Sequence, residues 1–262
     1  MRACLLVFAA AAAFGKTYPV DGIVLALDPV AHTMLVSHRP IARYMPAMVM
    51  PFRVEQPADL ATLYPGARVQ FDLVISNHQS VARNLRKAQG PDAAIAAPKE
   101  RLHVGDPLPD FRLTDQFGST VGLADLRGKV AAIDFIYTRC PLPDVCPRLS
   151  ANFATLQRRF HGRDLRLLSV TVDPDYDTPA VLAGYAKRWA ADPSAWRFLT
   201  GDVGPLAAAL GEVYWSDEGS IGHNSTTSIL DRQGRLAAMV EGSNYRIDQL
   251  EHLIARELEK PQ

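Results

Sequence analysis

The sequence predicts two domains, a small all-β barrel followed by an α/β domain with a mostly parallel sheet. The chain has 262 residues, of which 48% are hydrophobic and 21% charged, which is typical of a globular protein long enough for two domains. Short strand-like segments without a helical period fill residues 18–87. From residue 130 onward, apolar strand-like runs alternate with helix-like segments, and such alternation favours parallel strands joined by helices.

The first domain is expected to be a small closed barrel of the OB type. Turn signals such as Asp28-Pro29 and Tyr64-Pro65-Gly66 divide it into short strands. Five strands in so short a stretch favour closure into a barrel. The strands are expected at residues 22–27, 33–38, 48–54, 68–75 and 80–85.

The second domain is expected to alternate strands with helices. Residues 130–137 are apolar apart from Asp134, which indicates a strand buried on both faces. Thr178-Pro179 supplies a helix N-cap followed by proline at the first helical position. Further strands are expected at residues 167–172, 197–199, 226–230 and 236–241, and helices at residues 148–160, 180–190, 205–210 and 248–260.

The ends of the domains follow from changes in composition. Residues 1–16 contain one arginine and then an apolar run with small residues, which predicts a signal peptide or an N-terminal anchor and a periplasmic protein. Contact with a membrane is expected only through that segment. Residues 88–100 are rich in alanine, glycine and proline without apolar periodicity, as in a linker. The domains are therefore expected at residues 17–87 and 101–262.

The charge balance excludes one large class of partners. Lysine and arginine total 28 residues, as do aspartate and glutamate, and no basic stripe with interleaved aromatic residues is present. Nucleic acid is therefore not expected as a partner.

Two cysteines follow the predicted buried strand. Cys140 comes at its end, and Cys146 precedes Pro147 at the start of a helix, where the helix dipole favours a thiolate. Cys146 is therefore expected to be the more acidic thiol. Such a pair can close a structural disulfide, exchange one, or bind a soft metal. A bridge over five intervening residues adds little stability, which argues against a purely structural role.

A second chemical cluster lies in the predicted barrel. Three of the six methionines, Met45, Met48 and Met50, fall within residues 45–50, and His38 precedes them. Strand alternation places Met48 and Met50 on one face. Packing in the core is the ordinary role of a methionine, but thioethers with an imidazole also form a soft site suited to Cu(I) or Ag(I).

The motifs YTRCPLPDVCP and LLSVTVDPDYDTP, followed by His223 ahead of SILD, resemble the SCO/SenC family over residues 102–258. That family consists of thioredoxin-like copper chaperones for cytochrome c oxidase. The resemblance implies a thioredoxin-like fold, copper ligation by Cys140, Cys146 and His223, and a redox disulfide between the two cysteines. Thiolate and imidazole together accept Cu(I) and Cu(II). The chain departs from the family pattern in its longer spacing between the cysteines and in Gly222, where the family has aspartate.

Residues 18–87 resemble the CusF-type periplasmic copper-binding domain. The family pattern is a histidine followed by a Trp-Pro-x-Met-x-Met run. The resemblance therefore implies that His38, Met48 and Met50 are copper ligands. Met45 stands where that family has tryptophan, which makes it a fourth ligand or a lid over the site.

Together these features predict a periplasmic copper metallochaperone with one site in each domain, and not an enzyme. Its acceptor is expected to be a cytochrome c oxidase subunit or another copper-acceptor protein. Two alternatives stay open. One is a thiol:disulfide oxidoreductase acting on acceptor cysteines, and the other is a protein of copper sequestration or tolerance.

Overall fold

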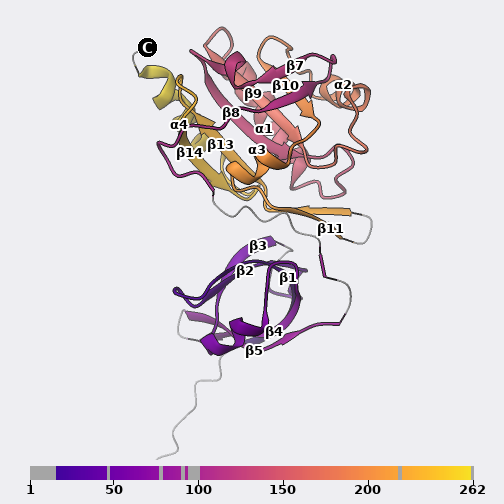
Figure 1. The fold of residues 1–262 in the computed structure, drawn as a ribbon, viewed down its shortest axis with the longest axis vertical. Helices are drawn as coiled ribbons and strands as arrows, with labels where there is room; N and C mark the ends of the chain where they lie inside the picture. The colour runs from indigo at the N-terminus through magenta and orange to yellow at the C-terminus, as the bar shows by residue number, and fades with distance from the viewer. Residues whose placement is uncertain are drawn as a thin grey trace, which may run out of the picture. The chain divides into compact units, whose positions relative to one another are not determined.

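The structure is a computed structural model that describes residues 16–45, 48–76, 79–89, 92–93, 101–217 and 220–260. The chain divides into two compact units between Asp92 and Ala93 (Figure 1). The predicted export segment and most of the predicted linker lie outside the described residues. Within the described parts of the chain, no helix combines the length and the apolar character that crossing a membrane requires.

The N-terminal unit is a five-stranded antiparallel sheet with the order β3-β2-β1-β4-β5. Strand β1 is longer than predicted because residues 16–23 pair with β4 while residues 22–28 pair with β2. In β2, buried residues alternate with half-buried ones, so one face of the strand lies on the core. The elements are β1 (Lys16–Asp28), β2 (Thr33–His38), β3 (Met48–Arg53), the 3-10 helix η1 (Pro57–Thr62), β4 (Arg68–Ser76) and β5 (Gln79–Lys87).

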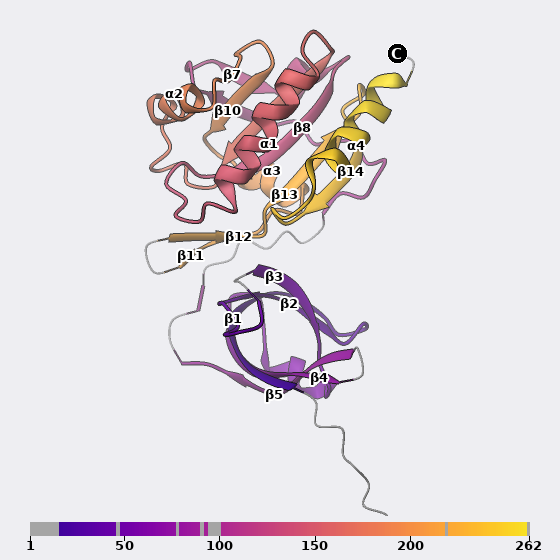
Figure 2. The ribbon, with the colours of Figure 1, turned by 180° about the vertical axis from the view of Figure 1, so that it is seen from behind.

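The sheet curls around its core without closing, so the prediction of a closed OB-type barrel is wrong (Figure 2). Strands β3 and β5 are its edges and share no ladder. An isolated parallel bridge between Val54 and Ala82 links the two edges, with the Glu55 N–H donating to the Ala82 carbonyl at 3.0 Å. Strand β3 has six residues and contains Pro51, which has no N–H to extend a ladder. The result is an all-β unit with an open seam.

The C-terminal unit has a seven-stranded sheet with the order β14-β13-β8-β9-β10-β6-β7. Its centre is parallel, from β8 through β9 to β10, and antiparallel pairs flank it on both sides. The parallel centre is the arrangement that the alternating sequence pattern predicted. The strands are β6 (Arg112–Asp115), β7 (Thr120–Gly122), β8 (Val130–Ile136), β9 (Leu165–Thr171), β10 (Trp196–Thr200), β13 (Thr226–Leu230) and β14 (Leu236–Glu241).

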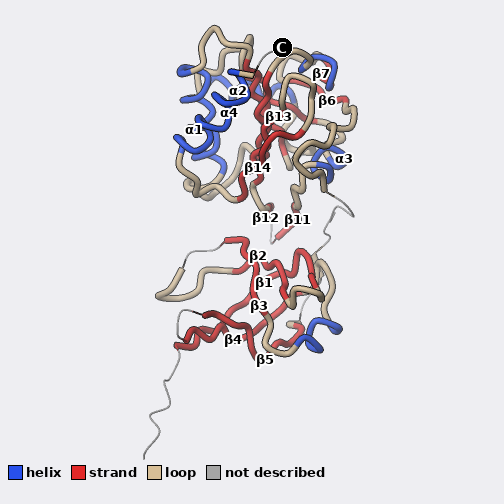
Figure 3. The backbone as a smooth tube through the Cα atoms, turned by 90° about the vertical axis from the view of Figure 1, so that its left-hand side faces the viewer, coloured by secondary structure: helices blue, strands red, loops and turns tan. Residues whose placement is uncertain are grey.

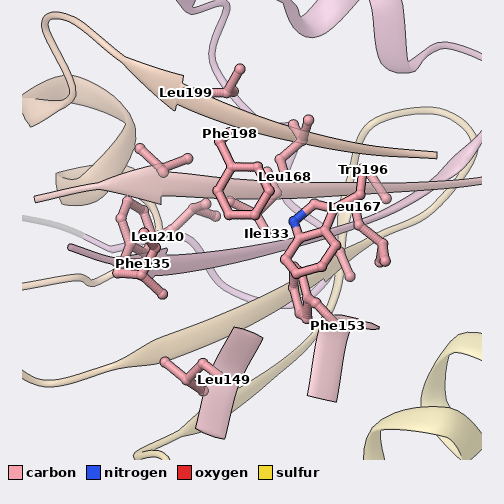
Figure 4. Packing of buried hydrophobic residues seen from close by; sticks show 14 of the residues in the cluster. Ile133, Phe135, Leu149, Phe153, Leu167, Leu168, Trp196, Phe198, Leu199 and Leu210 are labelled. Carbon is pink, nitrogen blue, oxygen red and sulfur yellow. The ribbon is translucent and has the colours of Figure 1, made fainter. Parts of the chain in front are cut away.

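Helices cover both faces of this sheet. Figure 3 shows α1 and α4 on one face and α3 on the other. The core between sheet and helices is apolar and aromatic, with Phe153 of α1 packed edge-on against Trp196 of β10 at 5.9 Å between ring centroids (Figure 4). The helices are α1 (Cys146–Arg159), α2 (Pro179–Arg188), α3 (Gly204–Ala209) and α4 (Ile247–Glu259), and the short 3-10 helix is η2 (Leu123–Leu126).

The topology brings the predicted site residues to one end of the sheet. Strand β8 ends at Ile136, and the loop that carries Cys140 leads directly into α1. Strand β13 runs antiparallel to β8, with Thr227 opposite Asp134, so the residues just ahead of β13 lie at the same end as the cysteine loop. Those residues follow a two-stranded hairpin, β11 (Tyr214–Asp217) and β12 (Ser220–His223), which the sequence analysis did not predict.

Candidate functional site

The two cysteines and His223 meet at the end of β8. Cys146 begins α1 and is fully buried, whereas Cys140 is half-buried, and both are free thiols. The Cys146 Sγ lies 3.6 Å from the His223 Nε2, and the Cys140 Sγ lies 3.8 Å from the Leu142 carbonyl oxygen. A cavity of about 390 Å³ opens beside Cys140 between Tyr137 and Trp189. A ligand in that cavity can therefore reach Cys140, whereas Cys146 is fully buried.

The acidity of the two thiols is the reverse of what the sequence predicted. The hydrogen bond from the Cys146 thiol is the main cause that lowers the pKa of Cys140 to about 5, while partial burial opposes this effect. Burial raises the pKa of Cys146, and the neighbouring Cys140 thiolate raises it further. The helix N-terminus at Cys146 does not offset complete removal from water, because desolvation disfavours the charged form. Cys140 is therefore the thiolate of the pair.

His223 is held from the side opposite the cysteines. Its Nδ1 lies 2.7 Å from an Oε1 of Glu212, whose side chain is completely buried. Its ring also stands edge-on to Tyr137, with 6.1 Å between centroids. Sequence reasoning missed Glu212, because no motif surrounds it and it lies in an irregular segment ahead of the hairpin.

Residues of the motif VDPDYDTP form hydrogen bonds with the start of the cysteine loop. The buried Asp177 carboxylate accepts the backbone N–H of Thr138 at 3.0 Å, the Thr138 hydroxyl, and the Thr171 hydroxyl at 2.5 Å. One residue further, the Arg139 Nε donates to Asp173 at 2.6 Å. These contacts fix the two residues that immediately precede Cys140.

A second buried carboxylate lies beneath the site. Asp134, in the middle of β8, is completely buried, and neither of its oxygens has a hydrogen-bond partner with good geometry among the described residues. Burial raises the pKa of Asp134 to about 8, and a weak interaction with the Ser169 hydroxyl opposes that rise. The sequence marked Asp134 only as the polar residue in an apolar strand.

The N-terminal unit brings three of its four predicted ligands to the inner face of its sheet. His38 and Met48 are directly paired across β2 and β3, and Met50 is two residues further along the same face of β3. Met45 stands apart from this ladder, in a bridge with Ile41, and its side chain is half-buried against the core. The two residues between Met45 and β3 lie outside the described part of the chain.

His38 has the geometry of a metal ligand. Its Nδ1 is 2.7 Å from the Arg39 carbonyl, so Nδ1 carries the hydrogen and Nε2 keeps its lone pair. That Nε2 is buried, and among the described residues it has no hydrogen-bond partner. Burial lowers the pKa of His38, which keeps the ring neutral. A buried acceptor without a partner is rare in proteins, and a metal ion would satisfy it.

In neither unit do the described side chains form a ready cluster of three or more histidine, cysteine, aspartate or glutamate residues spaced to hold a metal ion. In the C-terminal unit the arrangement is a pair of neighbouring thiols with an imidazole adjacent to Cys146. In the N-terminal unit it is one imidazole beside thioethers. Both arrangements supply soft donors of the kind that copper prefers.

Two family models match the chain. The model described as SCO1/SenC matches residues 99–259, and the model described as copper binding periplasmic protein CusF matches residues 17–87. Copper, the metal predicted from the sequence, is thus the metal of the family that the N-terminal unit matches.

Individual relatives match the C-terminal unit. The SCO1 protein homolog of Bacillus subtilis (strain 168) is 35% identical over 104 residues, which are 37% of this chain and 53% of the relative, so the match spans about half of that protein. A SCO2-like protein of Rickettsia prowazekii (strain Madrid E) is 29% identical over 149 residues, which are 52% of this chain and 69% of the relative.

A solved structure matches the same unit. The SCO1/SenC family lipoprotein from Bacillus anthracis str. Ames has a TM-score of 0.54 and 29% identity, and the match covers 62% of this chain and all of that one. The thioredoxin-like fold predicted for the C-terminal unit is confirmed by this likeness. With a family model covering more than half of its length, the chain belongs to the SCO1/SenC family.

Proposed function

We propose that this protein is a copper metallochaperone that works outside the cytoplasm, binds copper in both units, and passes it to an acceptor protein. The observation that carries the proposal is the 3.6 Å approach of the Cys146 Sγ to the His223 Nε2, with Cys140 near enough to Cys146 that each thiol shifts the pKa of the other. We infer that the two thiols and the imidazole close into a three-coordinate soft site when copper binds.

In the C-terminal unit, Cys140, Cys146 and His223 are the proposed ligands. Cys140 is already a thiolate at neutral pH because its pKa is lowered to about 5. Cys146 becomes a thiolate when a cation arrives, since metal binding displaces the thiol proton. The half-buried Cys140 makes the first contact, and the buried Cys146 and His223 complete the coordination. Oxidation of the pair to a disulfide removes both thiolates and abolishes the site.

In the N-terminal unit, His38, Met48 and Met50 are the proposed ligands, with Met45 as a fourth ligand or lid. The unpartnered Nε2 of His38 and the directly opposite Met48 support this assignment. Met48 is 41% exposed, so copper can enter there without opening the core. Thioethers need no deprotonation and cannot form a disulfide, so this site works in an oxidising compartment.

The proposed acceptor is a cytochrome c oxidase subunit or another copper-acceptor protein. Membership of the SCO1/SenC family supports the oxidase, and the match to a periplasmic copper-binding family supports a location outside the cytoplasm. Transfer proceeds by ligand exchange, in which thiolates of the acceptor replace those of the chaperone one at a time.

The direct test is a Cu(I) titration of the reduced full-length protein, followed by X-ray absorption of the copper. One copper per unit is expected, with sulfur and nitrogen neighbours at both sites. Single variants Cys140→Ser, Cys146→Ser and His223→Ala should each weaken the C-terminal site and leave the other site intact. If the reduced wild-type protein binds no copper through its cysteines, the proposal is wrong.

A thiol:disulfide oxidoreductase is the second candidate, because the acidity of the two thiols favours it. A half-buried thiolate at Cys140 beside a buried thiol at Cys146 is an attacking and resolving pair. Reduction of a model disulfide at a rate that copper loading does not inhibit, together with weak copper binding, would favour this function over the first.

A further inference from the structure

Glu212 is a buried carboxylate that the hydrogen bonds around it hold in one orientation. One oxygen accepts the Ser225 N–H at 3.2 Å and faces the His223 Nδ1 at 2.7 Å. The other accepts the backbone N–H and the hydroxyl of Thr226, each at 2.7 Å. The His223 side chain that Glu212 faces is 2% exposed.

This arrangement determines which nitrogen of His223 carries the hydrogen. Backbone N–H groups only donate, so both Glu212 oxygens act as acceptors, and Nδ1 must donate to Oε1. In a neutral ring the lone pair is then on Nε2, the atom that lies 3.6 Å from the Cys146 Sγ. Glu212 thus turns the coordinating face of the imidazole toward the cysteines.

The hairpin ahead of His223 leaves no room for a side chain at the position directly before the histidine. Gly222 pairs with Trp215, and a Cβ at position 222 would lie 2.4 Å from two carbon atoms of the buried Trp215 indole. The residue directly before His223 must therefore be glycine while Trp215 is in place. Glu212 reaches the ring from the other side of the hairpin, so the chain supplies the carboxylate from 11 positions upstream.

We propose that Glu212 is the positioning residue of the C-terminal site, and that it makes His223 a stronger ligand for Cu(II) than for Cu(I). This inference rests on the proposed copper site. Two thiolates dominate the binding of Cu(I), whereas imidazole contributes more to the harder Cu(II). A buried carboxylate behind the ring raises the basicity of the ligand and adds negative charge close to the metal, and the more highly charged ion gains more from both.

The first test uses the metal-free, reduced full-length protein, in which nitrogen-15 NMR reads the protonation of each histidine nitrogen. The Nδ1 of His223, which faces Glu212, is expected to carry a hydrogen. A hydrogen on Nε2 with Nδ1 bare would overturn the positioning role. Because this measurement uses the wild-type chain, it decides the question even if a Glu212 variant does not fold.

The second test compares copper affinities of Glu212→Gln with those of the wild type. Loss of such a partner typically weakens metal affinity by about 10- to 100-fold, and this loss is expected for Cu(II), with a smaller loss for Cu(I) and a shifted thiolate-to-Cu(II) absorption band. Glu257→Gln is the matched control, because Glu257 of α4 is another buried glutamate, paired instead with Arg256 and with Lys260 just after the helix. It should leave both affinities unchanged.

The possible outcomes separate the inference from the proposed function. Equal losses for Cu(I) and Cu(II) in Glu212→Gln, or no loss for either, would overturn the Cu(II) preference while the copper site itself stands. Absence of copper binding at the cysteines of the wild-type protein would overturn the proposed function, and the NMR result would then still decide whether Glu212 orients His223.

Discussion

Thr138 donates both its backbone N–H and its hydroxyl to the carboxylate of Asp177, 39 residues away in the sequence. Asp177 is fully buried, and Thr171 donates a third hydrogen bond to it. The contact joins the end of β8 to the loop after β9, and Cys140 follows Thr138 by two residues. The position of the cysteine loop therefore depends on a carboxylate in another part of the chain.

Replacement of Asp177 by alanine should destabilise the C-terminal unit and loosen the cysteine loop. Three donors would lose a charged acceptor in a buried position, which we expect to cost about 3 kcal/mol in the free energy of unfolding. Urea denaturation measures the cost. Asp175→Ala is the control, because Asp175 is an exposed residue of the same loop. Equal stability of the two variants would show that the Asp177 contacts contribute nothing.

The reversed acidity of the thiols should appear in their alkylation. With the pKa of Cys140 lowered to about 5, its thiolate is present throughout the range from pH 6 to 8. Cys146, buried and with its pKa raised, stays protonated there. Iodoacetamide should therefore modify Cys140 first, at a rate that rises with a midpoint near pH 5, as followed by mass spectrometry of the reduced protein. Faster labelling of Cys146 would restore the assignment made from the helix N-terminus.

The methionines of β3 can be tested by a substitution that separates packing from ligation. Leucine nearly conserves the volume and hydrophobicity of methionine but has no sulfur. Met48→Leu and Met50→Leu should keep the free energy of unfolding within about 1.5 kcal/mol of the wild-type value. Both should strongly weaken Cu(I) binding by the N-terminal unit. Met34→Leu is the matched control, because Met34 is fully buried in the adjacent strand β2. If all three variants bind Cu(I) equally well, the thioethers are core residues and not ligands.

Because Asp134 is buried, we expect the stability of the C-terminal unit to depend on pH. Its pKa is raised to about 8 in the folded protein from an ordinary value of 3.8, so between these values the folded state keeps a proton that the unfolded state has released. Because the native state binds more protons, stability falls as the pH rises, by roughly 1.4 kcal/mol per pH unit. The contribution is fully present below pH 3.8 and is lost by pH 8.

Asp134→Asn removes the titrating group, so its unfolding free energy should decline less between pH 5 and pH 8 than that of the wild type. Urea denaturation at several pH values measures the difference between the two proteins. Asp110→Asn, at an exposed position, should follow the wild-type curve. Parallel curves for the wild type and Asp134→Asn would mean that Asp134 is ionised in the folded state at neutral pH.

Periodicity and turn signals predicted most of the elements, because these depend on local sequence. The apolar run predicted at residues 130–137 contains the buried strand β8 (Val130–Ile136), and Thr178 caps α2 through its hydroxyl, as expected. Closure of the N-terminal sheet was not predictable in the same way. Closure depends on whether the two edge strands β3 and β5 pair with each other. The sequence of β3 alone does not show that their contact is limited to a single bridge at Val54.

The sequence predicted which residues belong to the candidate sites but not the burial and hydrogen bonding of those residues. Cys140, Cys146 and His223 stand in recognisable motifs, and the structure brings them together. The acidity of the thiols depends on complete burial of Cys146, which no local pattern reveals. Glu212 was missed for a related reason. Its role depends on a contact across 11 residues, in a segment that carries no periodic signal.

The last prediction concerns transfer of copper between the two proposed sites. A short tether holds one site near the other at an effective concentration that reaches about millimolar for flexible linkers. Residues 88–100 are the predicted tether. Copper loaded on His38, Met48 and Met50 should therefore move to the cysteine site in a first-order process, because thiolates are stronger soft ligands than thioethers. The movement requires reduced cysteines, since a disulfide offers no thiolate.

Stopped-flow absorption of the Cu(I)–thiolate band measures the transfer rate at several protein concentrations. The rate should not depend on the protein concentration. The comparison uses two full-length proteins, so that no part is tested in isolation. A Cys140→Ser/Cys146→Ser protein loaded with Cu(I) donates, and a Met48→Leu/Met50→Leu protein accepts. At micromolar concentration this intermolecular transfer should be slower than transfer within one chain and should rise with concentration. Equal rates for the two cases would show that joining the two units in one chain gives no advantage in transfer.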